Sequence, residues 1–394
     1  MKLGDVIKGY RIISEPTNAG GGKCMWAFAE KSEKQFFLKR FLEPKRPREG
    51  STASAASRRV RLEVCQEFED RHRGIMKRLR PDARGGGNLV LATDFFHEGS
   101  TYYKVTERID TSTLEKPQSL DPRQKAVLLK TLANSVQLLH DIDVVHGDLK
   151  PLNVLVQKRG GAAFHTAKLI DFDDSYLTGQ PPGRQDIAGD SLYGAPEWRR
   201  YVQEDETVQA EDLTTAVDTF ALGLMTHYYL TGALPGHADR YGSPADAVNA
   251  GEALAVDTRL SDSMQGLIRA MTALVPRKRP RMAAYLTALK DPQVCALQLR
   301  RPGTSKSEPD TKPGADTGNA ARPGGSSERV SRIRANLKGG GAPRATGPAP
   351  VSTQEPAPET PAAEAPAASP PEESRPAASK TSRVRINLGD RRKP

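Results

Sequence analysis

The stretch HGDLKPLNVLV, residues 146–156, decides how the fold and chemistry of this 394-residue chain are interpreted. It places Asp148 and Asn153 five residues apart, on a predicted loop between a helix and a strand. Asp171 ends the next predicted strand, in LIDFDDS. Each Asp taken alone is also typical of a turn. Together, Asn153 and Asp171 offer oxygen ligands for Mg²⁺, and Asp148 can orient a substrate hydroxyl, so the spacing indicates phosphoryl transfer.

The residues before this stretch predict a small sheet-rich lobe. Residues 9–42 have the pattern of strands broken by a glycine turn, NAGGGK, and residues 57–79 predict an amphipathic helix. From Asp121 onward the pattern becomes helical, beginning with an Asp cap and a Pro at the first helical position. We therefore expect an α+β protein with two lobes and a ligand-binding cleft between them. The apolar stripe of the first helix consists of Val60, Val64, Phe68, Ile75 and Leu79.

Four motifs resemble those of protein kinases in their bacterial serine/threonine form. HGDLKPLNVLV matches the catalytic loop, DFD at 171–173 matches the metal-binding DFG motif, FFLKRF contains the third-strand Lys39, and YKVTERI resembles the hinge. The resemblance implies the bilobal protein-kinase fold, with ATP and Mg²⁺ as cofactors and a protein as substrate. We expect the kinase domain to occupy residues 1–297, with an N-lobe of about 1–109 and a C-lobe of about 110–297.

The resemblance also implies a role for each matched side chain. Lys39 would hold the α/β-phosphates, Lys150 would stabilise the transferring phosphoryl group, and Thr106 would be the gatekeeper. Other candidates would contact the nucleotide through their backbone, which is most accessible at glycine. These residues are Glu107 and Ile109 beside the adenine, and Gly20, Gly21 and Gly22 beside the phosphates.

The family's helix glutamate, which pairs with the third-strand lysine, has no unambiguous counterpart in this chain. The register of Ile75 and Leu79 places His72 near the expected slot. Glu69 lies about one turn earlier, and we expect it to be the partner of Lys39 and part of the nucleotide site.

Two further positions depart from the family pattern. Asp173 replaces the glycine of DFG and has less access to positive φ, which predicts restricted flipping of this segment. Gly147 replaces the Arg that normally precedes the catalytic Asp and receives an activation-loop phosphate. We therefore predict an activity that does not depend on phosphorylation of the activation loop.

Small-molecule kinases of the aminoglycoside or choline type share HGDL, a downstream Asn and an IDF stretch. They generally lack three later elements that are present here: GAPEW, VDTFALG and PRKRP. The resemblance implies that Asp218 fixes the catalytic-loop backbone and that Arg279 pairs with Glu197, as buried charges must. A serine/threonine protein kinase that also autophosphorylates is therefore favoured. A small-molecule kinase and a pseudokinase scaffold, which binds partners through its tail, remain alternatives.

The composition of the chain indicates its cellular location and limits its binding partners. The net charge of +10 is spread out, and no zinc-finger spacing or aromatic-interleaved basic motif favours specific nucleic-acid binding. The three cysteines are far apart, which fits an intracellular compartment. No apolar run is long enough to span a membrane, and the N-terminus lacks a signal core. We expect a cytoplasmic protein with no membrane association.

Residues 298–394 predict a disordered tail rich in Pro and Ala. Residues 302–394 hold 15 of the 30 prolines and no aromatic residue, so they cannot bury enough apolar surface to fold. The motif Ser-Arg-[Ile/Val]-Arg-x-Asn-Leu occurs twice in it, beginning at Ser331 and at Ser382. The two copies are hypothesised to dock on a partner, to be read by a phosphopeptide-binding module, or to be autophosphorylated. A duplication without function is the alternative.

Overall fold

The computed structural model describes residues 1–19, 24–48, 54–79, 88–111, 114, 116–158 and 164–298. Gly20, Gly21 and Gly22, which were predicted to form the glycine turn, lie outside the described residues, as does the predicted tail from residue 299 onward. The domain boundary at 297 therefore stays a prediction. Among the described helices, none is long and apolar enough to cross a membrane.

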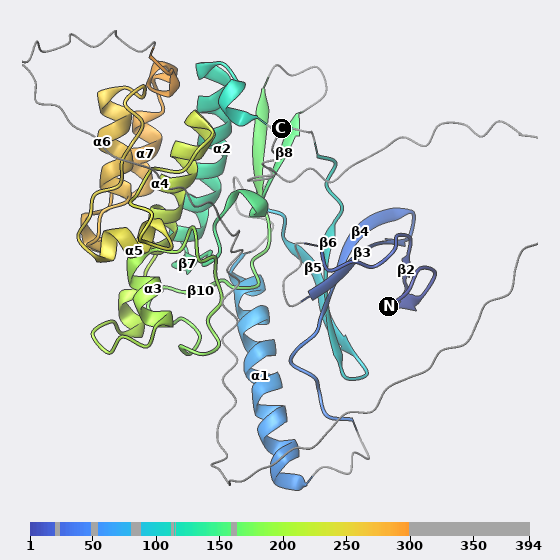
Figure 1. Cartoon of the computed structure of the whole chain (residues 1–394). Coiled ribbons are helices and arrows are strands. Elements are labelled where there is room, and N and C mark those ends of the chain that lie inside the picture. Colours follow the sequence, from blue (N-terminus) through green and yellow to red (C-terminus); the bar gives the residue numbers. More distant parts are fainter. Residues whose placement is uncertain are drawn as a thin grey trace, which may run out of the picture. The chain divides into compact units, whose positions relative to one another are not determined.

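The N-terminal part is an antiparallel sheet of six strands in the order β1-β2-β3-β4-β6-β5 (Figure 1). Side chains alternate between its two faces, as expected for strands. One face buries a small core that includes Ile12, Leu38 and Val105. The opposite face carries Lys39, which is paired across the strands with Trp26 and Lys104. The strands are β1 (Val6–Ile7), β2 (Tyr10–Ile12), β3 (Cys24–Lys31), β4 (Lys34–Phe41), β5 (Ala92–Glu98) and β6 (Thr101–Glu107).

Helix α1 (Ala55–Arg78) packs on the face of the sheet that carries Lys39, through a cluster that includes Cys65, Phe41 and Tyr102. The predicted apolar stripe is wrong in its first part. Val60 and Val64 are exposed, whereas Ile75 and Leu79 are buried. The buried residues of the helix begin only at Cys65, so periodicity alone predicted more core than the helix provides.

The C-terminal part is mainly helical, as the sequence predicts. Helix α2 (Pro122–His140) begins at the Asp121 cap, whose carboxylate accepts the backbone N–H of Gln124. Two short strand pairs, β7 with β10 and β8 with β9, carry the loops of the site. The strands are β7 (Val144–Val145), β8 (Val154–Lys158), β9 (His165–Leu169) and β10 (Tyr176–Leu177). The other α-helices are α3 (Pro196–Val202), α4 (Ala216–Thr231), α5 (Pro244–Asn249), α6 (Asp262–Met271) and α7 (Met282–Ala288).

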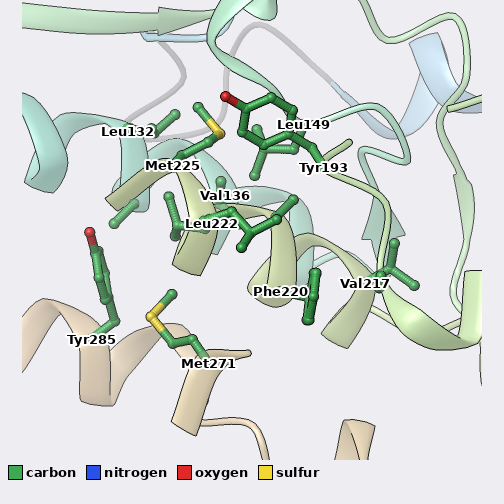
Figure 2. Close-up of a cluster of buried hydrophobic side chains, with 14 of the residues drawn as sticks. Leu132, Val136, Leu149, Tyr193, Val217, Phe220, Leu222, Met225, Met271 and Tyr285 are labelled. Carbon is green, nitrogen blue, oxygen red and sulfur yellow. The ribbon is translucent and has the colours of Figure 1, made fainter. Parts of the chain in front are cut away.

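Helix α4 is the central helix of this part, and almost all of its residues are buried. It packs against α2 and α6, and Figure 2 shows its side chains Phe220, Leu222 and Met225 among those of the neighbouring helices. A Cβ atom on Gly223 would lie 2.9 Å from the Cβ atom of Met271, so the close approach of α4 and α6 requires glycine there. This packing fixes the first turn of α4, which contacts the catalytic loop. Short 3₁₀ turns lie at Pro117–Ser119, Pro151–Asn153, Ala210–Asp212, Pro276–Lys278 and Pro292–Cys295.

Candidate active site

A pocket of about 810 Å³, open to solvent, is lined by residues from both parts of the fold. It brings together most of the residues that the sequence assigned to nucleotide and metal. Strand β4 supplies Lys39, strand β6 supplies Thr106 and its last residue Glu107, and the segment after β6 supplies Ile109. The opposite wall is formed by residues of the catalytic loop and the DFD segment. The predicted site residues in that wall are Asn153 and Asp171.

Three aromatic rings cover the sheet side of this pocket, and sequence reasoning assigned no role to them. The ring centroids of Trp26 and Phe37 lie 5.2 Å apart, and those of Trp26 and Phe28 lie 5.7 Å apart. Phe37 stands where the V-A-I-K motif of the family has alanine. The alternation of β4 puts Phe37 on the same face as Lys39, and this signal was available in the sequence.

The catalytic loop presents Asp148 between two hydrogen-bond donors. Lys150 Nζ lies 2.7 Å from its Oδ2 and 2.9 Å from its Oδ1, and Asn153 Nδ2 donates to Oδ2 over 2.8 Å. Burial raises the pKa of Asp148 to about 6; Lys150 opposes this effect, and the charges of Asp190 and Asp171 add to it. The loop thus holds a carboxylate in a fixed orientation beside a cation.

Asp218, in the first turn of α4, fixes the backbone of this loop, as the resemblance implied. Its carboxylate accepts the N–H of His146 over 2.8 Å and that of Gly147 over 3.2 Å. Burial lowers the pKa of His146, which favours the neutral ring. The contacts fit one tautomer, in which Nε2–H donates to the carbonyl of Ile170 and Nδ1 accepts the N–H of Asp148. The loop is therefore hydrogen-bonded both to α4 and to Ile170, the residue before Asp171.

Asn153 and Asp171 supply side-chain oxygens, the kind of ligand that a hard cation prefers. Both side-chain hydrogen bonds of Asn153 use its amide nitrogen, which leaves the amide oxygen for a metal. Asp171 lines the same pocket, and its side chain is 33% exposed. Within the described ranges, no group of three or more His, Cys, Asp or Glu side chains is placed to hold a metal ion. Two protein oxygens suit Mg²⁺, which usually takes further ligands from phosphates and water.

Lys39 is held by two carboxylates of the DFD segment. Its Nζ lies 2.7 Å from Asp171 Oδ1 and 2.5 Å from Asp173 Oδ2. Burial opposes the charged form of Lys39, but Asp171 and Asp173 raise its pKa well above the ordinary value. The φ angle of Asp171 is +66°, whereas Asp173 is not among the residues with positive φ. The loss of the DFG glycine is therefore accommodated without backbone strain at position 173.

The structure does not bring Glu69 to Lys39, contrary to the expected pairing. Glu69 Oε1 instead lies 2.6 Å from Arg46 Nη1 and accepts the hydroxyl of Tyr102 over 2.7 Å. The reason is the rotation of α1 about its axis, which turns His72 rather than Glu69 toward the DFD segment. His72 is buried there, with Nε2 3.8 Å from Asp173 Oδ1. The register of Ile75 and Leu79 placed His72 near this slot, and the expectation that Glu69 pairs with Lys39 is wrong.

The late motifs form a buried ion pair that the sequence predicted correctly. Arg279 donates from Nη1 and Nη2 to the two oxygens of Glu197, over 2.6 and 2.7 Å. Arg279 also donates to the carbonyls of Ala216, Ala273 and Leu274, so the desolvated guanidinium is well satisfied. This pair joins α3 to the segment before α7.

A sheet-rich part and a helical part enclose one pocket, which Lys39, Asn153 and Asp171 line beside the Asp148–Lys150 pair, and this arrangement is that of the protein-kinase fold. The sequence pattern of the family described as Protein kinase domain matches residues 54–289. The chain therefore belongs to the protein kinase family, and the expected bilobal fold is confirmed. The matched residues begin after Lys39 and after the glycine turn.

Several curated relatives are named as serine/threonine kinases, two of them bacterial. Serine/threonine-protein kinase pkn2 of Myxococcus xanthus is 27% identical over 187 residues, which are 45% of this chain and 22% of the relative. PkaA of Streptomyces coelicolor is 29% identical over 171 residues, 42% of this chain and 28% of the relative. Rabbit MAP kinase-activated protein kinase 2 is 23% identical over 238 residues, 60% of this chain and 57% of the relative. The matched region thus spans less than two thirds of each relative. The resemblance to bacterial serine/threonine kinases is confirmed.

Proposed function

We propose that this protein is an ATP-dependent serine/threonine protein kinase that phosphorylates protein hydroxyls, including hydroxyls of its own chain. The observation that carries the proposal is the grouping of Asp148, Lys150 and Asn153 next to the pocket that contains Lys39 and Asp171. A base, a cation and metal-binding oxygens in one place are what phosphoryl transfer requires of a protein.

Each group has a separate role in this proposal. Asp148 orients the attacking hydroxyl and takes its proton as the oxygen bonds to the γ-phosphorus and ADP leaves. Lys150 stabilises the charge on the transferring group, and Lys39 positions the α/β-phosphates. Mg²⁺, when held by Asn153 and Asp171, neutralises phosphate charge.

The nucleotide base is proposed to lie between the aromatic rings and Leu155. Trp26 and Phe37 offer flat faces that can stack on adenine, and Leu155 lies on the opposite wall of the pocket. The backbone of Glu107 and Ile109 is proposed to hydrogen-bond the adenine edge, beside the gatekeeper Thr106. Backbone contact of Gly20, Gly21 and Gly22 with the phosphates also stays a proposal, on residues outside the described ranges.

Phosphoryl transfer is tested with labelled ATP and Mg²⁺, on wild-type protein beside Asp148→Asn. We expect label on the protein or on an added basic peptide, and a loss of at least about 100-fold in the variant, as for removal of a general base. Binding is measured separately through Trp26 fluorescence, because the only other tryptophan, Trp198, is buried away from the pocket. Asp148→Asn should bind ATP nearly as well as wild type.

The same assay distinguishes the alternatives. ATP binding without transfer by wild type would contradict the proposal and favour the pseudokinase scaffold. Transfer only to aminoglycosides or choline would favour the small-molecule kinase. The Glu197–Arg279 pair and the Asp218 contacts support the protein kinase, because small-molecule kinases generally lack these elements.

The partners and the location of the protein stay predictions. The repeats at Ser331 and Ser382 are proposed as autophosphorylation sites or docking segments for a partner or a phosphopeptide-binding module. Mapping phosphate on the incubated wild-type protein by mass spectrometry tests the first role, which is contradicted if both serines stay unmodified. A cytoplasmic location, and the lack of membrane or specific nucleic-acid binding, are likewise expected from the sequence alone.

A further inference from the structure

Asp173, which replaces the DFG glycine, forms two ion pairs, one from each of its carboxylate oxygens to a different lysine. Oδ2 lies 2.5 Å from Lys39 Nζ, and Oδ1 lies 2.7 Å from Lys104 Nζ. Both lysines and Asp173 line the pocket, and their side chains are at most 13% exposed. Lys39 and Lys104 are direct cross-strand partners of β4 and β6, so the sheet sets the spacing of the two cations that Asp173 bridges.

Helix α1 does not supply a carboxylate to Lys39 within the described part of the chain. The residue that it turns toward the DFD segment is His72, whose Nε2 lies 3.8 Å from Asp173 Oδ1. Burial, with Lys104 as the next cause, holds the pKa of His72 well below its ordinary value, so the ring is neutral. Glu69 is committed to Arg46 and Tyr102.

The other carboxylate on Lys39, that of Asp171, has a competing role. It is the metal-binding Asp of the proposed function, and a cation bound there takes up the negative charge that Lys39 now shares. Asp173 has no such second role, because its two oxygens already face Lys39 and Lys104. It is therefore the carboxylate that stays available to Lys39 when nucleotide and metal are bound.

The charges of the cluster balance in this arrangement. Lys39 and Lys104 supply two positive charges, and Asp171 and Asp173 supply two negative ones. Without Lys104, the second oxygen of Asp173 would be buried with no cation, which is costly. The ion pair with Asp173 therefore compensates the burial of the charged Lys104 side chain in the pocket.

We propose that Asp173 is the positioning residue for Lys39, in place of the helix glutamate of the family, and that Lys104 holds the second oxygen of Asp173. This proposal rests on the proposed function in taking Lys39 as the phosphate-binding residue and Asp171 as a metal-binding residue. The proposal implies that the DFD segment sets the position in which Lys39 binds phosphate. Phosphate binding by Lys39 then does not depend on the position of α1.

The first test compares nucleotides with and without phosphates on Asp173→Asn. Both ATP–Mg²⁺ and adenosine are titrated, with Trp26 fluorescence as the readout. We expect ATP binding to weaken about 10- to 100-fold, the effect of one charge-assisted hydrogen bond, and adenosine binding to stay within about two-fold. General damage to the fold would weaken both ligands, and unchanged ATP binding would overturn the proposal.

Glu69→Gln is the matched control, because it removes the carboxylate of the helix residue that was expected to pair with Lys39. We expect it to lower the thermal midpoint by disrupting the contacts to Arg46 and Tyr102, and to leave ATP binding within about two-fold of wild type. A loss of ATP affinity in Glu69→Gln, without one in Asp173→Asn, would restore the helix glutamate as the partner of Lys39.

A transplant of the carboxylate keeps the proposal testable if Asp173→Asn does not fold. The double variant His72→Glu with Asp173→Gly moves the charge to the helix slot and conserves the charge balance. We expect it to bind ATP at least about 10-fold more tightly than Asp173→Gly alone; equal affinities of the two variants would contradict the proposal. Both tests read binding, so a wild type that binds ATP without phosphorylating protein overturns the proposed function and leaves these tests intact.

Discussion

A Cβ atom on Gly147 would lie 2.5 Å from the backbone carbonyl oxygen of Asp174. The φ angle of Gly147 is +78°, a conformation that side-chain-bearing residues rarely adopt. The catalytic loop and the segment after DFD therefore touch backbone to backbone at this point. The sequence interpretation treated Gly147 as a missing arginine, and the structure adds that only glycine fits.

Gly147→Ala is expected to lower both stability and turnover. The substitution adds backbone strain of about 1–3 kcal/mol and pushes Asp148 away from its present position. Unfolding in denaturant and kcat at saturating ATP measure the two effects. Gly266→Ala, in α6 with open space around it, is the control and should be neutral or slightly stabilising. A Gly147→Ala protein as stable and active as wild type would contradict the geometry.

Removal of phosphate from the protein is expected to leave the rate of peptide phosphorylation unchanged. Position 147 has no guanidinium with which to bind an activation-loop phosphate. The check is to treat purified protein with a phosphatase, remove the phosphatase, and compare initial rates with mock-treated protein. A large loss of activity that returns on rephosphorylation would show that another residue senses the phosphate.

Arg279→Met is expected to destabilise the fold by about 3–5 kcal/mol, because it leaves Glu197 buried without its cation. Chemical unfolding of the two proteins measures the difference. The exposed pair Arg59–Glu63 supplies the control, and Arg59→Met should change stability by no more than about 0.5 kcal/mol. Equal effects of the two substitutions would mean that burial does not determine how much an ion pair contributes to the free energy of unfolding.

The stability of the fold is expected to fall as the pH drops from 7 to 5, in part because of His227. Burial lowers the pKa of His227, whose Nδ1 donates to Ala233 and whose Nε2 accepts the N–H of Asp257. Asp257 raises this pKa and Arg259 lowers it, but burial prevails. The unfolded chain therefore takes up a proton near pH 6.5 that the folded protein does not, and this stabilisation is lost as the pH falls.

The variant His227→Asn isolates this contribution, since the other histidines are common to both proteins. It should be less stable than wild type at pH 7, and the difference should narrow as the pH falls to 5. Unfolding curves at a series of pH values provide the comparison. A constant difference across this range would contradict the assignment.

The sequence predicted the features that depend on local spacing. The catalytic loop, Lys39, Asp171 and the Glu197–Arg279 pair each lie in a short motif, and the structure brings the first three to one pocket region. The partner of Lys39 was not predictable in this way. It depends on the phase of α1 relative to the sheet, and on a carboxylate 134 residues away in the chain. The sequence analysis did not identify Lys104 as a pocket residue. Lys104 lies two residues before Thr106 on a strand, so both side chains are on the same face of the sheet.

The error in the stripe of α1 has a related cause. Periodicity shows which residues share a helix face, but not how far the partner surface extends along it. Val60 and Val64 share a face with buried residues and are nevertheless exposed.

All three cysteines are buried, and this makes the protein suitable for chemical labelling. Burial raises the pKa of Cys24 to about 12, so its thiol stays protonated near neutral pH. Cys295 is similar, and Cys65 is fully covered. Thiol reagents react with exposed thiolates. A single cysteine introduced on the surface will therefore be the site of attachment for a dye or spin label, without prior removal of the native thiols.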